Sequence, residues 1–136
     1  MKPNELIEHA RYLEARGDRV GAAAALRRAA EAPSHTGRAL AHLGRVQRKR
    51  GRPHDALSTY KAALHHLEAP RELARVYAEI GQLYYAMHED GEAAYYFRRA
   101  AGLDPTQAHH LGSVSRSIGA GVHQLDTADI DIIRLQ

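Results

Sequence analysis

The 136-residue sequence contains no cysteine and no tryptophan, and it has only one phenylalanine. Without cysteine the chain can form no disulfide, no thiolate nucleophile and no cysteine-ligated zinc or iron–sulfur site. Long hydrophobic runs are also missing, since the longest strongly apolar stretch, Val20 to Leu26, is far shorter than the roughly 20 residues that span a bilayer. The first residues mix charged and apolar side chains and include no signal-peptide hydrophobic block. We therefore expect a mature cytoplasmic protein without membrane insertion.

Positive and negative charges are distributed unevenly along the chain. Residues 1–70 hold 13 Lys and Arg against 7 Asp and Glu, whereas residues 71–136 hold 6 against 9. The N-terminal part is therefore cationic and the C-terminal part anionic. This asymmetry predicts a cationic face that meets an acidic partner.

A repeated pattern of small and large apolar residues divides most of the sequence into units. A motif of Ala, a large apolar residue and Ala recurs at offsets of 34 and 37 residues, as Ala22, Leu26 and Ala29, then Ala56, Tyr60 and Ala63, then Ala93, Phe97 and Ala100. Each motif follows a segment whose apolar residues are three and four positions apart, which is the spacing of one helix face. Two of these segments contain a glycine at the equivalent position, Gly44 and Gly81. Each unit is therefore predicted to be a pair of helices.

Units of about 34 residues made of two such helices resemble the tetratricopeptide repeat, in which Leu-Gly, Tyr, Ala, Phe, Ala and Pro occupy fixed positions. The unit at 74–107 resembles it most, through Gly81, Tyr84, Ala93, Phe97, Ala100 and Pro105. The unit at 37–73 keeps Leu43, Gly44, Ala56 and Ala63 but has Gln47 at the tyrosine position. The unit at 3–36 keeps Ala22 and Ala29 and has Ala10 at the glycine position.

The resemblance implies an all-α, right-handed αα-solenoid of three helix pairs. Those pairs would occupy 3–36, 37–73 and 74–107, followed by a seventh, capping helix within 108–120 and an extended acidic-hydrophobic tail at 121–136. Helices are expected at 3–16, 19–31, 36–50, 53–68, 71–87, 90–102 and 106–118, with prolines in their first turns and with Asp18 and Asp104 as N-caps. We expect Gly44 and Gly81 to face Ala56 and Ala93, so that paired helices cross closely.

In tetratricopeptide proteins the first helices of successive pairs line a concave groove, and the resemblance implies which residues of this chain would face it. Ile7, Ala41 and Ala78 are among these positions. The candidate partner-binding residues are Arg11, Arg38, His42, Arg45, Arg48, Lys49, Arg75, Gln82 and Tyr85. Because arginine forks pair with carboxylates through two parallel hydrogen bonds, the expected ligand is an acidic peptide or a chain-terminal carboxylate. The alternative is that they form a solvated helix face, on which the cations only interact favourably with the C-terminal end of the helix.

Other chemistries have weaker support in the sequence. The basic run at 45–52 could contact phosphates, but no aromatic residues lie within it to stack on bases, so a nucleic-acid adaptor ranks third among the expected functions. The pairs His65-His66 and His109-His110 lack the His or carboxylate four residues on that would make a compact metal site. No nucleophile, base and orienting acid form a set. We expect no enzyme, no cofactor and no metal site.

The last fifteen residues, VHQLDTADIDIIRLQ, combine large aliphatic side chains with a net negative charge. Their Ile-Asp-Ile alternation has the period of two of an extended strand. We expect this tail to dock on the cationic groove of its own or a neighbouring chain, through Asp126, Asp129, Ile130, Asp131 and Ile132; the alternative is a structural cap. The function expected for the chain is that of a protein-binding adaptor, and the leading alternative is a self-assembling scaffold or small chaperone that uses its convex or terminal surfaces.

Overall fold

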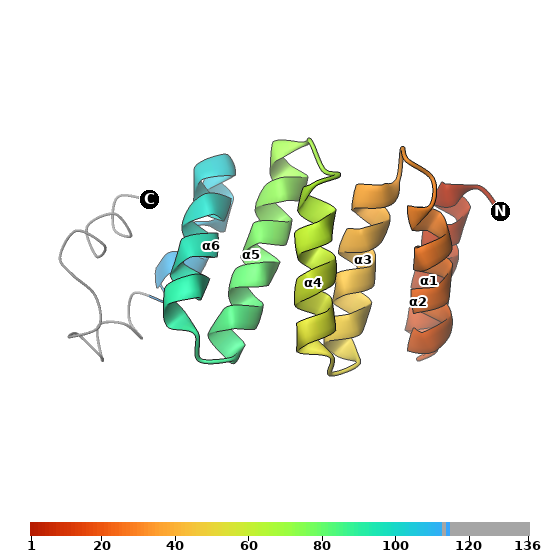
Figure 1. The fold of residues 1–136 in the computed structure, drawn as a ribbon, viewed down its shortest axis with the longest axis horizontal. Coiled ribbons are helices and arrows are strands. Elements are labelled where there is room, and N and C mark those ends of the chain that lie inside the picture. The colour runs from red at the N-terminus through yellow and green to blue at the C-terminus, as the bar shows by residue number, and fades with distance from the viewer. Residues whose placement is uncertain (113, 115–136) are drawn as a thin grey trace. The chain divides into compact units, whose positions relative to one another are not determined.

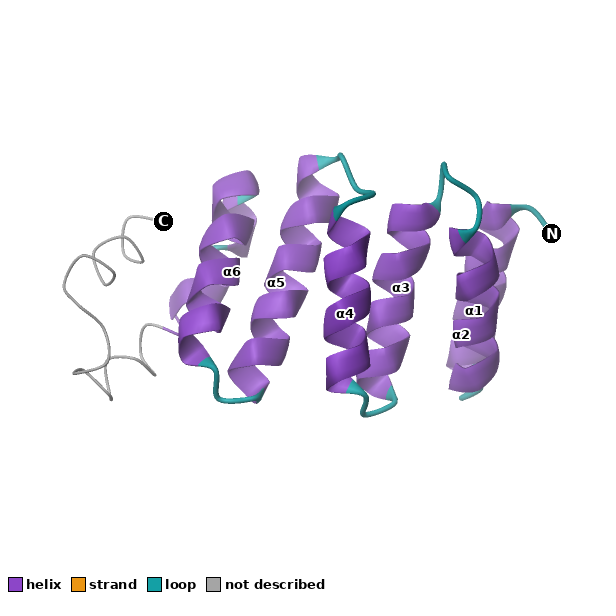
Figure 2. Cartoon of the chain, viewed as in Figure 1, coloured by secondary structure: helices purple, strands orange, loops and turns teal. Residues whose placement is uncertain are grey.

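The computed structural model describes residues 1–112 and 114, which belong to two compact units, Met1–Leu67 and Glu68–Gln136. The described part of the chain forms six α-helices and one short 3-10 helix and contains no β-strand, as the all-α prediction requires (Figures 1 and 2). Within these residues no helix combines the length and the apolarity needed to cross a membrane.

Unit 1 consists of two consecutive helix pairs. Its helices are α1 (Pro3–Ala15), α2 (Arg19–Ala30), α3 (Thr36–Lys49) and α4 (Pro53–Leu64). Neighbours in the chain pack on one another, α1 on α2, α2 on α3 and α3 on α4. Alanines dominate the buried faces because they let the helix backbones approach closely; Ala22, Ala29, Ala56 and Ala63 are fully buried. The repeat of Ala at a fixed spacing is therefore the contact surface of the second helix in each pair.

Unit 2 contains the third helix pair and the start of a further helix. Its helices are α5 (Pro70–Ala86) and α6 (Asp90–Leu103), followed by the 3-10 helix η1 (Pro105–Gln107) and by helical conformation at 109–112 and 114. Leu111 and Val114 are buried in a cluster with Phe97, so this segment covers α6 as the predicted capping helix does. Residue 113 and residues 115–136 lie outside the described residues, so the end expected for the capping helix is not tested.

For the first six helices the expected bounds are met to within one or two residues, with one exception; of the seventh, expected at 106–118, the described part is a 3-10 helix at its start and α-helical conformation only from 109. α4 ends at Leu64, four residues earlier than expected, and the extra residues of the longer spacing lie in α5, which has 17 residues against 14 in α3. Local chemistry explains the matching starts. Proline is the first residue of α1, α4 and α5, Asp18 accepts a hydrogen bond from the Gly21 N–H at 2.8 Å, and Asp104 accepts one from the Thr106 N–H at 3.1 Å.

Glycine in the first helix of a pair accommodates an aromatic ring of the second helix. A Cβ atom added to Gly44 would lie 2.6 Å from Tyr60 Cε1, and one added to Gly81 would lie 2.6 Å from Phe97 Cδ1. Both distances are too short for real contacts. The group nearest to each glycine is therefore the ring, which projects across the seam into the space that the missing side chain leaves. The facing of these glycines by Ala56 and Ala93 stays a prediction.

We expect Gly81→Ala to lower the free energy of unfolding by about 1–3 kcal/mol, because the new methyl group overlaps the ring of Phe97. Gly102→Ala in α6 is the matched control, since a Cβ there meets no heavy atom within 4 Å. That control should gain up to about 1 kcal/mol from the higher helix propensity of alanine. Urea denaturation followed by circular dichroism measures both. Equal stability changes in the two variants would contradict the seating of the ring on Gly81.

His110 extends the packing of Phe97. The two rings are stacked, with centroids 5.0 Å apart and planes 11° from parallel, and the His109 ring lies 3.9 Å from that of His110. Burial, and to a lesser extent the charge of His109, lowers the pKa of His110 below its ordinary value of 6.5. The folded state therefore favours the neutral imidazole.

The stability that His110 contributes should be fully present above pH 6.5 and should fall as the pH drops below that value towards the lowered pKa. Between pH 7.5 and 5.5 the midpoint of thermal unfolding should drop more in the wild type than in His110→Phe, which keeps a stacked ring but cannot titrate. An identical pH dependence in both proteins would show that the imidazole gains no charge during unfolding in this range.

Candidate functional site

The cationic residues predicted on the first helices of unit 1 occupy one face of α1 and one face of α3. On α3 the predicted residues lie at 38, 42, 45, 48 and 49. Positions 48 and 49 are three and four residues after 45, and the others are also three or four residues apart, so all five form a single stripe. The stripes of α1 and α3 lie side by side, because Arg38 Nη1 is 3.4 Å from Asn4 Oδ1 and the Lys49 ammonium forms an ion pair with Glu14. We call this surface the α1–α3 face; it comprises Asn4, Glu8, Arg11, Glu14, Arg38, His42, Arg45, Arg48 and Lys49.

Both of these inter-helix contacts join residues one repeat apart. Asn4 and Arg38 are separated by 34 residues, and Glu14 and Lys49 by 35. Equivalent positions of successive repeats therefore become neighbours in space. Arg38 and Lys49 were expected on the groove, but the pairing of Lys49 with Glu14 of α1 was not, although the period of the repeat contained this information.

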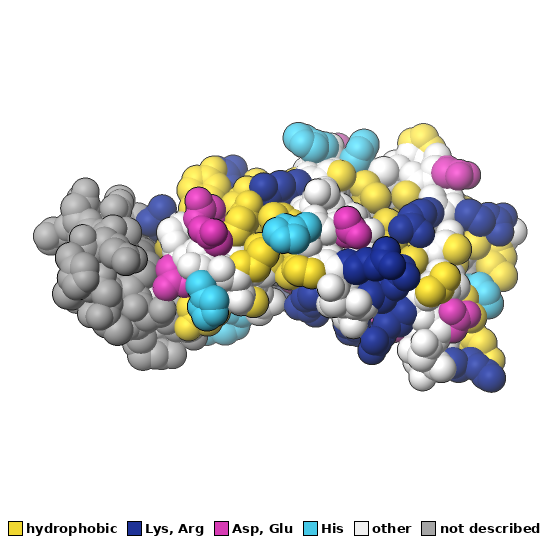
Figure 3. Space-filling view, turned by 60° about the horizontal axis from the view of Figure 1, so that its bottom comes forward, with side chains coloured by type: hydrophobic (Ala, Val, Ile, Leu, Met, Phe, Trp, Pro, Cys, Tyr) yellow, Lys and Arg dark blue, Asp and Glu magenta, His cyan; other side chains and the backbone are white. Residues whose placement is uncertain are grey.

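The α1–α3 face carries five Lys and Arg residues against two carboxylates, so the nine residues that define it have a net positive charge. Glu14 pairs with Lys49, and Glu8 lies 3.5 Å from Arg11. A hollow of about 350 Å³ is lined by Arg11, Glu14, Ala15 and Lys49. The side chains of Arg11 and Lys49 remain about half exposed, at 57% and 48%. Figure 3 shows Lys and Arg side chains gathered over unit 1.

The end of α3 is anchored from α2. Arg19, the first residue of α2, donates a hydrogen bond from Nη1 to the Lys49 backbone carbonyl at 3.1 Å. This bond satisfies one of the carbonyls that a helix leaves without an internal partner. It fixes the turn of α3 that carries Arg48 and Lys49, and the sequence offered no signal for it.

Three apolar residues expected to face the groove are instead buried. Ile7, Ala41 and Ala78 are 1%, 5% and 3% exposed. Each lies on the first helix of its pair at the boundary between the core stripe and the outer stripe, and packing against the neighbouring helices removes them from solvent. The α1–α3 face is correspondingly more polar than predicted.

The remaining predicted groove residues lie on α5, in unit 2. Arg75 pairs with Glu79 at 3.2 Å, Gln82 is half-buried, and Tyr85 is 39% exposed. The three share one stripe of α5, being seven and three residues apart.

Tyrosines of α5 and α6 form a cluster around Tyr96. Tyr96 is half-buried, and its ring contacts those of Tyr77, Tyr84 and Tyr95 at centroid distances of 5.0–6.1 Å. The Arg99 guanidinium lies over the rings of Tyr77 and Tyr95, at 5.0 and 5.6 Å, and donates hydrogen bonds to both hydroxyls. The bond to Tyr77 raises the pKa of Arg99 above its ordinary value.

The tail residues Asp126, Asp129, Ile130, Asp131 and Ile132 lie outside the described residues. Among the residues that are described, no group of three or more His, Asp or Glu side chains is arranged to hold a metal ion.

Comparison with known proteins identifies the fold. No family model and no curated protein matches the chain by sequence. Among solved structures, a tetratricopeptide repeat protein from Parabacteroides merdae superposes with a TM-score of 0.71 and 24% identity, covering 85% of this chain and 45% of that one. The MamA protein gives a TM-score of 0.72 at 20% identity, covering 87% and 63%.

A third neighbour is a putative kinesin light chain of Podospora anserina with nearly identical tetratricopeptide-like repeats, at a TM-score of 0.65 and 14% identity, covering 87% of this chain and 66% of that one. The chain thus spans about half to two thirds of the length of these neighbours. Helix pairs with Ala and Gly at the repeat positions, together with these superpositions, show that the chain has the tetratricopeptide-repeat fold.

Proposed function

We propose that the chain is a non-enzymatic protein-binding adaptor in the cytoplasm that binds an acidic peptide segment on the α1–α3 face. The tetratricopeptide-repeat fold supports a protein-binding role in general. The observation that supports an acidic ligand is the stripe of cations on α3, which lies beside α1. The face as a whole has a net positive charge, since it contains five Lys and Arg residues and only two carboxylates, Glu8 and Glu14.

The geometry of the face favours an extended or helical segment over a small molecule. The cations of α3 extend from Arg38 to Lys49, a stretch of twelve residues that makes about three helical turns. A ligand must therefore be elongated to reach them all. Arg38 and Arg48 are exposed, and their guanidinium groups can each take a carboxylate through two hydrogen bonds. We propose that α5 also binds acidic peptide segments, through Arg75, Gln82 and Tyr85.

Paired charges on the face set its selectivity. An ion pair such as Glu14–Lys49 must open, or be shared, before a ligand carboxylate can use the ammonium group. Glu14 therefore weakens the binding of acidic ligands and repels segments whose acidic residues are placed opposite it. The proposed ligand presents its carboxylates to α3 and not to α1.

A self-assembling scaffold that uses a terminal surface is the second candidate function. The observation that favours it is an apolar hollow of about 440 Å³ between α1 and α2 of the first helix pair.

We expect Arg38→Glu/Arg48→Glu to weaken the binding of an acidic probe about tenfold or more, which corresponds to about 1.4 kcal/mol. The probe is a fluorescein-labelled Glu-Ala peptide, read by anisotropy beside a Gln-Ala peptide of the same length. Arg27→Glu/Arg71→Glu is the matched control, because both residues are exposed, neither lies on the α1–α3 face and the net charge changes equally. Equal losses of affinity in the two variants would show that the effect comes from the overall charge of the protein and not from the α1–α3 face.

A labelled thymidine oligonucleotide separates the nucleic-acid alternative from the peptide proposal. Tighter binding of this probe than of the Glu-Ala peptide, with a steep fall as salt rises, would contradict the proposed ligand class.

Glu14→Gln should tighten the binding of the Glu-Ala peptide about two- to fivefold, since it removes the carboxylate that occupies Lys49. The free energy of unfolding should change by less than about 1 kcal/mol, as is usual for an exposed ion pair. Glu31→Gln, at the exposed end of α2, is the control for a lost negative charge off the face. Weaker binding by Glu14→Gln would show that Glu14 helps the ligand to bind.

A further inference from the structure

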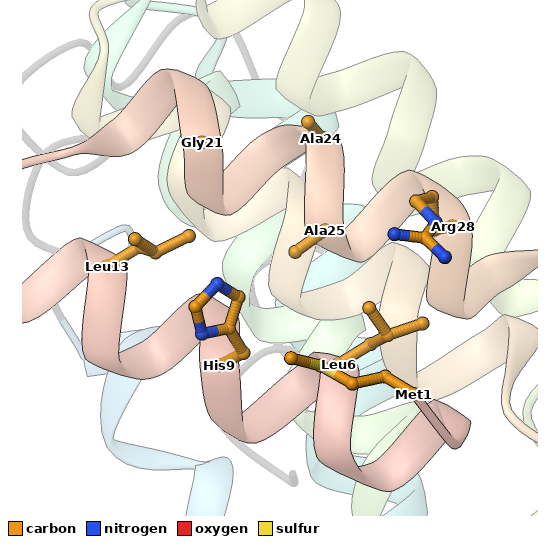
Figure 4. A pocket seen from close by; sticks show the side chains of 8 residues that line it. All are labelled: Met1, Leu6, His9, Leu13, Gly21, Ala24, Ala25 and Arg28. Carbon is orange, nitrogen blue, oxygen red and sulfur yellow. The ribbon is translucent and has the colours of Figure 1, made fainter.

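The outer side of the first helix pair contains an apolar hollow that no described segment covers. Its volume is about 440 Å³, within the range of sites that hold ligands. One wall is a stripe of α1 and the other a stripe of α2 (Figure 4), and the lining residues are Met1, Leu6, His9, Leu13, Gly21, Ala24, Ala25 and Arg28. We call this the end-face hollow.

The end-face hollow lies apart from the contact of α2 with α3. The core stripe of α2 consists of Ala22, Leu26 and Ala29, all at most 1% exposed, which belong to a cluster with residues of α3. The hollow uses the neighbouring positions 21, 24, 25 and 28, and its lining includes no residue of α3. Leu6, Leu13 and Ala25 belong to or pack against the same core cluster, so the hollow is the open edge of the core of the first helix pair.

The end-face hollow is an apolar surface that no described helix covers. Its walls are mostly hydrocarbon, Ala24 is exposed, the lining residue Met1 is 70% exposed, and Val20, next to Gly21, is 65% exposed. An apolar segment that docks in the hollow would remove this hydrocarbon from water.

The chain itself contains a segment with the matching chemistry. Residues 122–136 carry five large aliphatic side chains, Leu125, Ile130, Ile132, Ile133 and Leu135, and three aspartates against one arginine. Such a segment is too apolar to be a solubilising appendage and too acidic for an ordinary core element. It needs an apolar site with a positive rim.

The end-face hollow has that rim. Its positive charge comes from Arg28, which is exposed, and its other polar member is the half-buried His9. Over larger distances the charges also agree, because Met1–Leu67 holds 13 Lys and Arg against 6 Asp and Glu, whereas residues 68–136 hold 6 against 10. Opposite net charges on the two ends of the sequence steer one end towards the other in an encounter between copies.

The α1–α3 face fits the segment less well. Its hollow contains the Glu14 carboxylate and less apolar surface than the end-face hollow, since its other lining residues are Arg11, Ala15 and Lys49. The five large aliphatic side chains of the segment would therefore gain less burial there, even though the face also attracts acidic residues.

We propose that residues 122–136 of one copy occupy the end-face hollow of a second copy, so that the chain associates head to tail. The inference is independent of the function proposed for the α1–α3 face. Because donor segment and receptor hollow are different surfaces, the contact is heterologous, and each added copy leaves one free donor and one free receptor.

Two full-length variants isolate the donor and the receptor. Ala24→Glu places a carboxylate in the hollow at an exposed helix position, and Ala86→Glu on α5 is its matched control. Ile130→Asp/Ile132→Asp removes aliphatic side chains from the donor, and Gln124→Asp/Thr127→Asp adds the same charge without removing them. Circular dichroism verifies that each variant is folded.

Sedimentation velocity decides the proposal. The wild type and both controls should increase in mass with concentration, and each test variant alone should remain a monomer. An equal mixture of the two test variants should form a dimer and nothing larger, because one supplies the only intact donor and the other the only intact receptor. A wild type that stays monomeric at every concentration, or a mixture that stays monomeric, overturns the proposal.

A direct binding measurement covers the case in which a variant changes the fold. A fluorescein-labelled peptide of residues 122–136 should bind the Ile130→Asp/Ile132→Asp chain, and Arg38→Glu/Arg48→Glu added to that chain should leave its affinity unchanged within about twofold. Arg28→Glu added instead should weaken it at least tenfold. Loss of peptide binding on reversal at Arg38 and Arg48 alone would overturn the proposal by placing the segment on the α1–α3 face.

Discussion

The helix pairs of this protein depend on a large side chain of the second helix that fills space left by a small residue of the first. Tyr60 is fully buried against Gly44, and Phe97 is 3% exposed against Gly81. The equivalent positions of the first pair are Ala10 and Leu26, both at most 2% exposed. A larger residue on one helix is matched by a smaller one on the other, which keeps the packed volume nearly constant. Substitution on one side alone would leave either an overlap or a cavity.

The same repetition that builds the core also organises the charged surface. A period of about 34 residues brings equivalent positions of successive first helices side by side, as the contacts Asn4–Arg38 and Glu14–Lys49 show. Charges that are far apart in the sequence therefore act on one another directly. Acidic residues of α1 lower the positive potential of α3 without cancelling it, and this balance controls what the α1–α3 face can bind.

A stack of helix pairs also creates end surfaces, which must be covered or made polar. At the end of α6, the segment containing Leu111 and Val114 covers Phe97 and Ala101. On the outer side of α1 and α2 the described chain provides no equivalent cover, and the end-face hollow remains open. The uncovered apolar surface of the first helix pair is the observation behind the inference of head-to-tail association.

The sequence by itself determined the helices and the repeat. Prolines, Asp18, Asp104 and the spacing of alanines are local signals, and each acts on the backbone within a few residues, so helix starts and the fold class follow from them. Helix ends are less strongly encoded: α4 stops at Leu64, four residues before its expected end.

Tertiary structure decided the features that depend on how side chains of different helices meet. The sequence showed that Gly44 and Tyr60 belong to a close crossing, but only the packed pair shows that the ring itself lies on the glycine. Burial of Ile7 and Ala41, the pairing of Glu14 with Lys49, the half-buried Tyr96 and the end-face hollow all arise from contacts between helices. Helical periodicity gives the direction in which a side chain points along its own helix, whereas burial and pairing depend on the distance to a neighbouring helix, which is fixed only when the chain has packed.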